Sequence, residues 1–231
     1  MRSLRGKRSE AADATSRVRD ADRTKAGILD VAQEEFASKG LAGARIDEIA
    51  ERTHTSKRMI YYYFESKEGL YVAVLERCYS GIRKVESLPD LETVNPSEAL
   101  KTIVEVNFDY HMQNQDFVRL VMSENIAHGE HIQNLESVRT RNISVVNTLG
   151  ALLRRGEEIG EFRSGIDAVN LHMTISALCF YNVSNRHTFS RIFDWDMTSP
   201  AAVARRRAIV VDTVMRWCTK LGEGVKSSPD R

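Results

Sequence analysis

The stretch IDEIAERTHTSKRMIYYYFESK, residues 46–67, has the pattern of two short helices joined by a tight turn. His54 lies where the chain must turn, and histidine tolerates left-handed backbone better than most residues other than glycine. Ser56 is a good N-cap, so the second helix is predicted to begin there. Spacings of three and four residues place the apolar side chains of the first helix on one face: Ile46, Ile49 and Ala50.

The predicted second helix has an inner and an outer side. Ile60 is expected to point into a small core, which Tyr63 or Phe64 completes. Two cations at a helix start oppose the helix dipole, so their presence makes sense if a polyanion binds there. Lysine and arginine contact phosphates or guanine edges, and tyrosine hydroxyls donate to phosphate oxygens. The outer side chains are of these types: Lys57, Arg58, Met59, Tyr61 and Tyr62.

A third helix is predicted after this pair. Ser66 would cap it, and Lys67 at its start would contact phosphate. The arrangement is that of a helix-turn-helix, whose second helix enters the DNA major groove by its N-terminal residues. The competing interpretation is that the tyrosine run is only core. Three consecutive tyrosines cannot all face inward on a helix, so the DNA-binding interpretation is favoured.

Residues 23–75 resemble the DNA-binding domain of the TetR family of bacterial transcription regulators. The match includes SKRMIYYYFESKEGLYVAVL, residues 56–75, and a set of upstream positions: Ile28, Ala32, Phe36, Gly40, Ile46, Ile49 and Ala50. Arg45 stands where the family usually has Ser or Thr, and this departure can change a phosphate contact. His54 and Thr55 stand where Gly and an aliphatic residue are usual, and this departure can loosen the turn.

The resemblance implies a double-stranded DNA operator as partner and a regulator of transcription as function. We expect a repressor that a small-molecule effector, such as an aromatic acid, releases from the operator. The alternative is a helix-turn-helix regulator controlled by a protein partner or by its abundance. The residues predicted to contact DNA are Arg45, Ser56, Lys57, Arg58, Met59, Tyr61, Tyr62 and Lys67.

Length and charge set further limits. The chain has 231 residues, enough for one small module and one larger domain. Residues 1–66 hold 13 Lys and Arg against 11 Asp and Glu, so DNA binding depends on local placement of charge. No apolar run approaches the ~18 residues of a membrane span, and the charged N-terminus lacks the apolar stretch expected of a secretory signal. The three cysteines are far apart in the sequence and indicate a reducing compartment: Cys78, Cys179 and Cys218. A cytoplasmic protein without membrane contact is therefore expected.

The whole chain is predicted to be all-α, because every long segment has helical period and none alternates. Gly40 is expected to end the first helix. After a connecting helix that runs to about Val85, further helices are expected over 97–112, 116–127, 132–158, 167–190 and 200–221. The predicted organisation is a disordered basic tail (1–21), a helix-turn-helix domain (22–66), a connecting helix and loop (67–95), an effector-binding and dimerisation domain (96–222) and a tail (223–231). The alternative for the first tail is an arm that follows the DNA backbone or minor groove.

The last two predicted helices are the expected dimer interface. Residues 167–183 are apolar almost all round, so they need cover on most faces. The TetR resemblance implies that two C-terminal helices of each subunit pair into a four-helix bundle of a homodimer. Arg205, Arg206 and Arg207 are expected to form a solvated face of the same helix. One stripe of the 200–221 helix is predicted to contact the second subunit: Val203, Val210, Val214 and Trp217.

The resemblance also implies a small-molecule pocket in the second domain. Aromatic and Met side chains with a few polar groups suit such a pocket, although they also suit a core. The segment Glu124-Asn125, with Ala127-His128-Gly129, is similar to the second domain of repressors of aromatic-acid breakdown such as the nicotinate regulators, which favours an aromatic carboxylate held by His or Arg. The candidate lining residues are Phe108, His111, Met112, Phe117, Glu124, Asn125, His172, Met173, Ser176, Cys179 and Phe180.

Two other functions are disfavoured. Glu124, His128 and His131 would share one helix face and could ligate a metal, but Gly129 argues that the helix has ended, so no metal is predicted. No phosphate-binding glycine loop, GxSxG or HExxH motif is present, and an enzyme would have no use for the exposed cations and tyrosines. Neither an enzyme nor a cofactor is therefore predicted.

Overall fold

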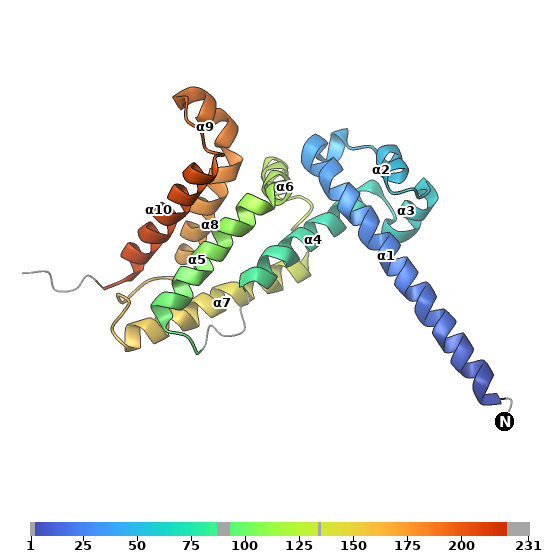
Figure 1. The fold of residues 1–231 in the computed structure, drawn as a ribbon, viewed down its shortest axis with the longest axis horizontal. Helices are drawn as coiled ribbons and strands as arrows, with labels where there is room; N and C mark the ends of the chain where they lie inside the picture. Colours follow the sequence, from blue (N-terminus) through green and yellow to red (C-terminus); the bar gives the residue numbers. More distant parts are fainter. Residues whose placement is uncertain (1–2, 87–92, 134, 221–231) are drawn as a thin grey trace, which may run out of the picture. The chain divides into compact units, whose positions relative to one another are not determined.

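The computed structural model describes residues 3–86, 93–133 and 135–220, and these residues form helices without any strand (Figure 1). The all-α fold class predicted from the sequence is confirmed. The chain divides into two compact units. Unit 1 comprises the chain up to Arg77 together with Ser123–Ile132, and unit 2 comprises Cys78–Met122 and the chain from Gln133 onward.

Unit 1 is built from α1 (Ser3–Gly43), α2 (Ile46–Arg52), α3 (Lys57–Phe64) and the first part of α4 (Lys67–Glu86). Gly40 has a φ of 68° and interrupts the first helix, as predicted. Helix α1 extends back to Ser3, whereas we predicted a disordered tail over residues 1–21. No Gly or Pro occurs between Lys7 and Ala26, so the residues that most disfavour a helix are absent there.

The core of unit 1 joins these helices through apolar side chains. Ile60 and Phe64 of α3 are buried, so Phe64 rather than Tyr63 completes the small core. Phe36 and Tyr71 meet edge to face with ring centroids 5.1 Å apart, which joins α1 to α4. The other fully buried members include Ile28, Ala32, Ile49, Leu70 and Val74.

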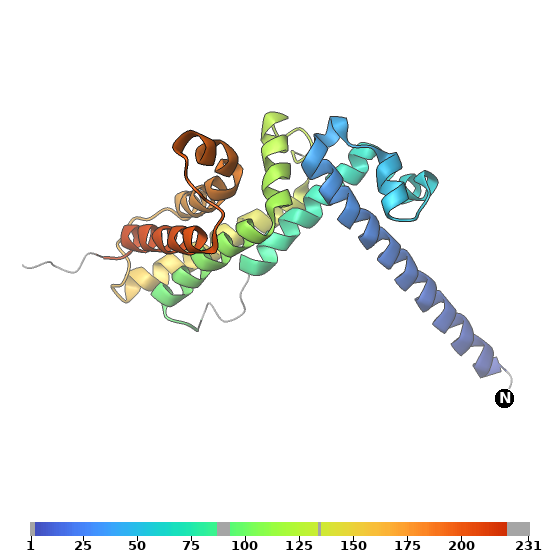
Figure 2. The same ribbon diagram turned by 45° about the horizontal axis from the view of Figure 1, so that its top comes forward.

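Unit 2 holds the remaining helices: α5 (Pro96–Gln113), most of α6 (Gln115–Ile126), α7 (Glu136–Glu158), α8 (Ala168–Ser184), α9 (Arg186–Phe193) and α10 (Pro200–Cys218). Helices α5 and α8 pack against each other and against α7 and α10, as both ribbon views show (Figures 1 and 2). One helix predicted over 167–190 is two, because Asn185 ends α8 and begins α9.

The domain boundary differs from the prediction, which placed the connection at residues 67–95. In the structure α4 begins in unit 1 and continues into unit 2 after Arg77. Helix α6 begins in unit 2, and its last residues from Ser123 belong to unit 1. The predicted loop between α4 and α5 lies partly outside the described residues, as does the tail predicted over 223–231.

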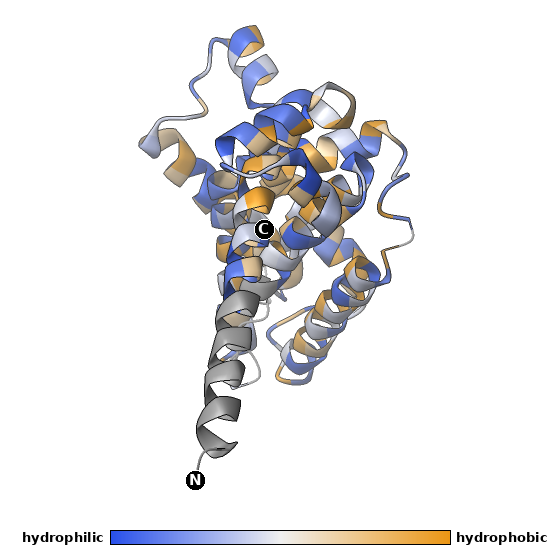
Figure 3. Ribbon diagram, turned by 90° about the vertical axis from the view of Figure 1, so that its right-hand side faces the viewer, coloured by the Kyte–Doolittle hydropathy of each residue, from blue (hydrophilic) through white to orange (hydrophobic). Residues whose placement is uncertain are grey.

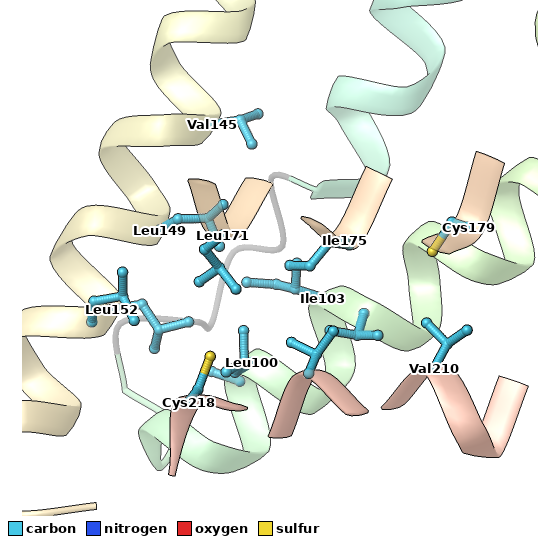
Figure 4. Close-up of a cluster of buried hydrophobic side chains, with 14 of the residues drawn as sticks. Leu100, Ile103, Val145, Leu149, Leu152, Leu171, Ile175, Cys179, Val210 and Cys218 are labelled. Atoms are coloured by element: carbon cyan, nitrogen blue, oxygen red, sulfur yellow. The ribbon is translucent and has the colours of Figure 1, made fainter. Parts of the chain in front are cut away.

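Most helices are amphipathic, with polar and apolar residues alternating around them (Figure 3). Their apolar sides form one core in unit 2, drawn in Figure 4, in which Leu100, Leu149 and Leu171 come from α5, α7 and α8. Val210 and Val214 of α10 are fully buried in this core. Their assignment to a dimer interface is therefore wrong: the stripe packs into its own subunit.

The loop between α7 and α8 is tied to the end of α10. Phe162 and Thr219 form an isolated antiparallel bridge, and the backbone N–H of Arg163 donates to the carbonyl of Cys218 over 2.9 Å. Phe162 is buried, and its ring packs directly on the backbone of Gly156 near the end of α7. A side chain at position 156 would overlap this ring.

We therefore expect Gly156→Ala to destabilise the protein, by about 1–3 kcal/mol as other overpacked sites do. Thermal unfolding measures the effect. Gly150→Ala is the matched control in the same helix, since its new Cβ would lie 3.7 Å from the Cβ of Ala168, an ordinary contact. Alanine has the higher helix propensity, so the control should be neutral or stabilising. An equal loss of stability in both variants would contradict this explanation.

Candidate functional site

The turn between α2 and α3 has the closed geometry of a helix C-cap. His54 has a φ of 50°, which confirms the predicted left-handed turn. The N–H of Thr55 donates to the carbonyl of Ala50 over 3.0 Å, and that of His54 donates to Glu51 over 3.1 Å. This pair of hydrogen bonds is the Schellman pattern, with His54 in the position that usually holds glycine. The turn therefore fixes the direction in which α3 leaves.

Helix α3 begins at a side-chain cap. The hydroxyl oxygen of Ser56 accepts a hydrogen bond from the N–H of Met59 over 3.2 Å, so the predicted N-cap is confirmed. With Ile60 and Phe64 inside, the outer side of α3 carries Arg58 and Tyr62, both exposed. Tyr62 is 76% exposed, a large value for an aromatic side chain without a partner surface.

Two further cations stand beside α3. Lys57 forms an ion pair with Asp47, and Arg45 lies 3.9 Å from the same carboxylate. Asp47 thus holds Arg45 at the start of α2 next to Lys57 at the start of α3. Arg58 has no ion-pair partner among the residues described, which leaves its guanidinium available to an incoming anion.

Helix α2 is held against α1 by a small charged network. The Lys39 ammonium contacts Glu48 over 2.6 Å and Glu35 over 2.8 Å. Hydrogen bonding to Glu35, then to Glu48, raises the pKa of Lys39, and the hydrogen bond from Lys39 lowers the pKa of Glu48. Glu35 also accepts the backbone N–H of Arg45 over 3.1 Å. The network therefore fixes the N-terminus of α2.

The start of α4 completes this surface. Ser66 caps α4 as predicted, since its hydroxyl accepts the N–H of Gly69 over 2.9 Å. Glu65 before it has a φ of 66°, a left-handed residue that the sequence analysis missed. Lys67 is half-buried, and its ammonium donates to the carbonyl of Ala42 over 3.1 Å. Lys67 therefore also joins the end of α1 to α4, a structural role that we did not predict.

Glu124 does not lie in an effector pocket, contrary to the prediction. It is buried in unit 1, where the hydroxyl of Tyr71 lies 3.3 Å from its carboxylate. The backbone N–H groups of His131 and Ile132 donate to the same carboxylate over 2.7 and 3.2 Å. This carboxylate closes the turn after α6, so its role is structural. Asn125 is exposed at the end of α6 and does not line a pocket either.

The same turn bears on the metal alternative. Helix α6 ends at Ile126, and His128 has a φ of 56°, so Glu124, His128 and His131 do not share one helix face. No group of three or more His, Cys, Asp or Glu side chains is placed to hold a metal ion within the described ranges. In these same ranges no helix is both long enough and apolar enough to cross a membrane.

The remaining effector candidates differ in how deeply they are buried. Phe108 and Cys179 belong to the main core of unit 2, and Met112 packs against it. Met173 is 60% exposed on the surface of α8, so its assignment to an interior pocket is wrong. His172 and Ser176 of α8 are half-buried.

The structure brings several candidates together around His111. Its ring centroid lies 5.8 Å from that of Phe117 and 6.3 Å from that of Phe180. The Nδ1 atom of His111 lies 2.7 Å from the carbonyl of Asn107. Burial lowers the pKa of His111, so its imidazole is neutral at ordinary pH. The side-chain oxygen of Asn107 is buried without a hydrogen-bond partner in the part of the protein described.

Arg83 of α4 is a residue of this group that sequence analysis missed. It is buried within unit 2, which is rare for a guanidinium. Burial, and to a smaller extent the charge of Arg83, lowers the pKa of His172 to about 4. The charge of Arg83 also acts on His111. The available signal in the sequence was its spacing of four residues from Tyr79, a half-buried aromatic residue on the same side of α4.

His172 also lines a surface cavity of about 320 Å³ between α7 and α8. Arg139 and Asn142 of α7 and Val169 of α8 stand at the same cavity.

The helix-turn-helix with its cationic and phenolic outer side defines a DNA-binding regulator of transcription. Two family models match the chain, one described as "Bacterial regulatory proteins, tetR family" over residues 28–74 and one as "Tetracyclin repressor-like, C-terminal domain" over residues 96–214. The chain belongs to the TetR family of bacterial transcription regulators.

Curated relatives and solved structures agree with this assignment. The HTH-type transcriptional repressor NicS of Pseudomonas putida is 32% identical over 87% of this chain and 94% of its own. The repressor SCO4008 of Streptomyces coelicolor is 31% identical over 72% of this chain and 81% of its own. The crystal structure of SCO4942 from Streptomyces coelicolor has a TM-score of 0.65 at 27% identity, covering 84% of this chain and 98% of that one.

Proposed function

We propose that this protein is a dimeric repressor that binds a near-palindromic DNA operator and releases it when an acidic small molecule binds unit 2. The observation that carries the DNA-binding part is the outer side of α3, where Arg58 and Tyr62 are exposed beside Lys57. Repression is supported by the relatives NicS and SCO4008, both named as transcriptional repressors. The protein acts in the cytoplasm, where its operator lies, and by binding rather than by catalysis.

In this proposal the exposed groups have distinct roles. Lys57, Arg58 and Tyr62 contact base edges in the major groove, since they stand at the N-terminal and outer side of α3. Tyr61 and Lys67 contact phosphates, and Arg45 does so at the start of α2. Ser56 and Met59 lie in the first turn of α3, where a DNA backbone passes closest.

The dimer contact is proposed for the outer side of α8 with α10. Val169, Met173, Ala177 and Tyr181 are exposed at intervals of four residues and form one apolar line along α8. Ile209 is exposed on α10, which packs beside α8. Single exposed apolar residues are ordinary on a surface, but a continuous line of them indicates a contact with another surface. Of the stripe first predicted, Val203 and Trp217 pack only partly against the core.

The effector is proposed to bind around Arg83, His111 and His172. A buried guanidinium favours an anion, and it pairs with a carboxylate through two parallel hydrogen bonds. The neutral imidazole of His111 and the free oxygen of Asn107 add hydrogen-bonding groups. The rings of Phe117 and Phe180 offer contacts to an aromatic body. Met112 lies on α5 with His111, and Ser176 lies on α8 with Phe180.

Two helices can carry the effector signal to the DNA-binding unit. Arg83 lies on α4, whose N-terminal part belongs to unit 1. Phe117 lies on α6, whose last residues, with Glu124, belong to unit 1. A shift of either helix on effector binding would therefore move residues that position α3. An effector changes operator affinity only as far as it binds the two arrangements differently.

For DNA binding, Arg58→Ala should lose operator affinity by about 1–3 kcal/mol, while affinity for random DNA changes little. Lys67→Ala should weaken both DNAs alike and reduce the salt dependence by about one phosphate contact. Fluorescence anisotropy with both DNAs measures these changes. Lys101→Ala, an exposed cation of unit 2, is the control. An equal loss on both DNAs for Arg58→Ala would make Arg58 a phosphate contact.

For the dimer, Met173→Glu should shift the protein to monomers, because a charge would enter the apolar line of α8 in both subunits. Light scattering and sedimentation measure the mass. Ile159→Glu is the control, since Ile159 is also exposed but caps α7. An unchanged mass for Met173→Glu would place the dimer contact on another surface. Val214 does not serve this test, because a charge in the core would unfold unit 2.

For the effector, Arg83→Met should leave operator binding intact and abolish its release by acids. The measurement is a mobility shift with the operator, titrated with nicotinate and benzoate and with their neutral amides. The wild-type protein should be released by at least one acid and by neither amide. If the Arg83→Met variant left the operator at the same acid concentration as the wild-type protein, Arg83 would not be part of the effector site. His172→Gln should weaken release without abolishing it, since His172 lines the cavity between α7 and α8 and is only half-buried.

A further inference from the structure

A carboxylate stands among the cations that are proposed to contact DNA. Asp47 lies in the first turn of α2, where its Oδ1 atom forms an ion pair with the ammonium of Lys57 at the start of α3. Its Oδ2 atom lies 3.9 Å from the guanidinium of Arg45. All three side chains are exposed, so they lie on the surface that the proposed contacts occupy. An anion on such a surface repels phosphates and opposes binding, so its presence calls for an explanation.

Stability of α2 does not by itself explain Asp47. A carboxylate in the first turn of a helix interacts favourably with the helix dipole, but Glu48 is a second acid in this turn. Glu48 also ties α2 to α1, because it contacts the ammonium of Lys39 over 2.6 Å. An exposed ion pair such as that of Asp47 with Lys57 contributes little to folding stability. What the pair does change is the region of space that the ammonium of Lys57 can reach.

The backbone that carries Asp47 is held in place on both sides. The N–H of Arg45 donates to the carboxylate of Glu35 in α1 over 3.1 Å, and the side chain of Ile46 is buried. Lys57, in contrast, has a compact charge on a flexible four-carbon chain, which can follow any phosphate within reach. The ion pair with Asp47 holds that charge between the starts of α2 and α3.

Holding this charge affects two kinds of DNA differently. Affinity for random sequence comes almost entirely from phosphates that the protein neutralises, and an ammonium already paired with a carboxylate neutralises less. Affinity for an operator also depends on base contacts, which need a side chain in one orientation. Asp47 therefore weakens binding to random DNA more than it weakens binding to the operator. Specificity is the difference between these two binding free energies, so it rises.

We propose that Asp47 is a positioning residue that increases the discrimination between operator and random DNA by keeping the ammonium of Lys57 off the phosphates. This role rests on the proposed DNA-binding function, and it belongs to a residue that was not among the predicted DNA contacts. Asp47 itself contacts no base. It acts through the charge and the reach of Lys57, to which it is joined across the helix-turn-helix.

The test compares the affinities of two DNA duplexes. One is the duplex that the wild-type protein selects from a pool of random sequences, and the other has the same bases in scrambled order. In Asp47→Asn, the scrambled duplex should bind about fivefold more tightly at about 0.15 M salt, with a salt dependence steeper by about one phosphate contact. The selected duplex should gain less, so the ratio of the two affinities should fall by at least about twofold. Fluorescence anisotropy over a series of salt concentrations measures both affinities.

Three further variants locate the effect. Glu34→Gln is the charge-matched control: Glu34 of α1 pairs with Arg52 in the last turn of α2, so the change frees a cation at the other end of that helix. It should leave the ratio of the two affinities near that of the wild-type protein. Asp47→Glu keeps the carboxylate and should also keep the ratio. In Lys57→Gln, the further change Asp47→Asn should not alter the ratio, because the charge that Asp47 holds is gone.

Three results would overturn the proposal. The ratio could stay at the wild-type value in Asp47→Asn, or it could fall as far in Glu34→Gln, which would assign the effect to net charge. It could also fall when Asp47→Asn is added to Lys57→Gln, in which case Lys57 is not involved. Thermal unfolding checks the fold of each variant, and Asp47→Ser repeats the test if Asp47→Asn is unfolded.

The same experiment separates this role from the function on which it rests. If the wild-type protein selected no sequence from the pool, the proposed function and the role of Asp47 would both be wrong. If it selected a sequence and the ratio did not change in Asp47→Asn, only the role of Asp47 would be wrong.

Discussion

The DNA-binding surface depends on the backbone of one residue. His54 adopts a left-handed conformation that costs a residue other than glycine roughly 1–2 kcal/mol. Two hydrogen bonds back to Ala50 and Glu51 offset this cost, and they set the direction of α3 relative to α2. Ile60 then enters the core, and Arg58 and Tyr62 necessarily point outward because they stand on the other side of the same helix. A different turn would bury another side of α3 and lose the cationic surface.

Unit 1 was predictable because its signals are local. The caps at Ser56 and Ser66 and the helix end at Gly40 each act within three or four residues of chain. Helical period then assigned Ile60 to the inside without any knowledge of its partners. The interactions missed in this unit were those between distant residues, such as the hydrogen bond of Lys67 to the carbonyl of Ala42.

Unit 2 was predictable in class but not in its contacts. A helix such as α8, apolar on most sides, does not indicate which side faces its own domain, and α10 was assigned the wrong way: Val214 lies inside and Ile209 outside. Glu124 could not be placed because its partners include Tyr71, 53 positions earlier in the chain. Arg83 was overlooked for the related reason that burial of a charged side chain is decided by tertiary packing and not by periodicity.

The arginines of unit 2 show how environment assigns different roles to one side chain. Arg207 forms ion pairs with two carboxylates of α5, and these pairs join α10 to α5. Arg83 is buried in unit 2. Burial lowers the pKa of His111 and of His172, so neither imidazole adds a second positive charge near Arg83. Arg205 and Arg206 line a cavity between α8, α9 and α10 that has aromatic and no acidic side chains. Desolvation of a guanidinium is costly unless an anion compensates for it. Where the fold supplies the anion, as it does for Arg207, the arginine therefore has a structural role.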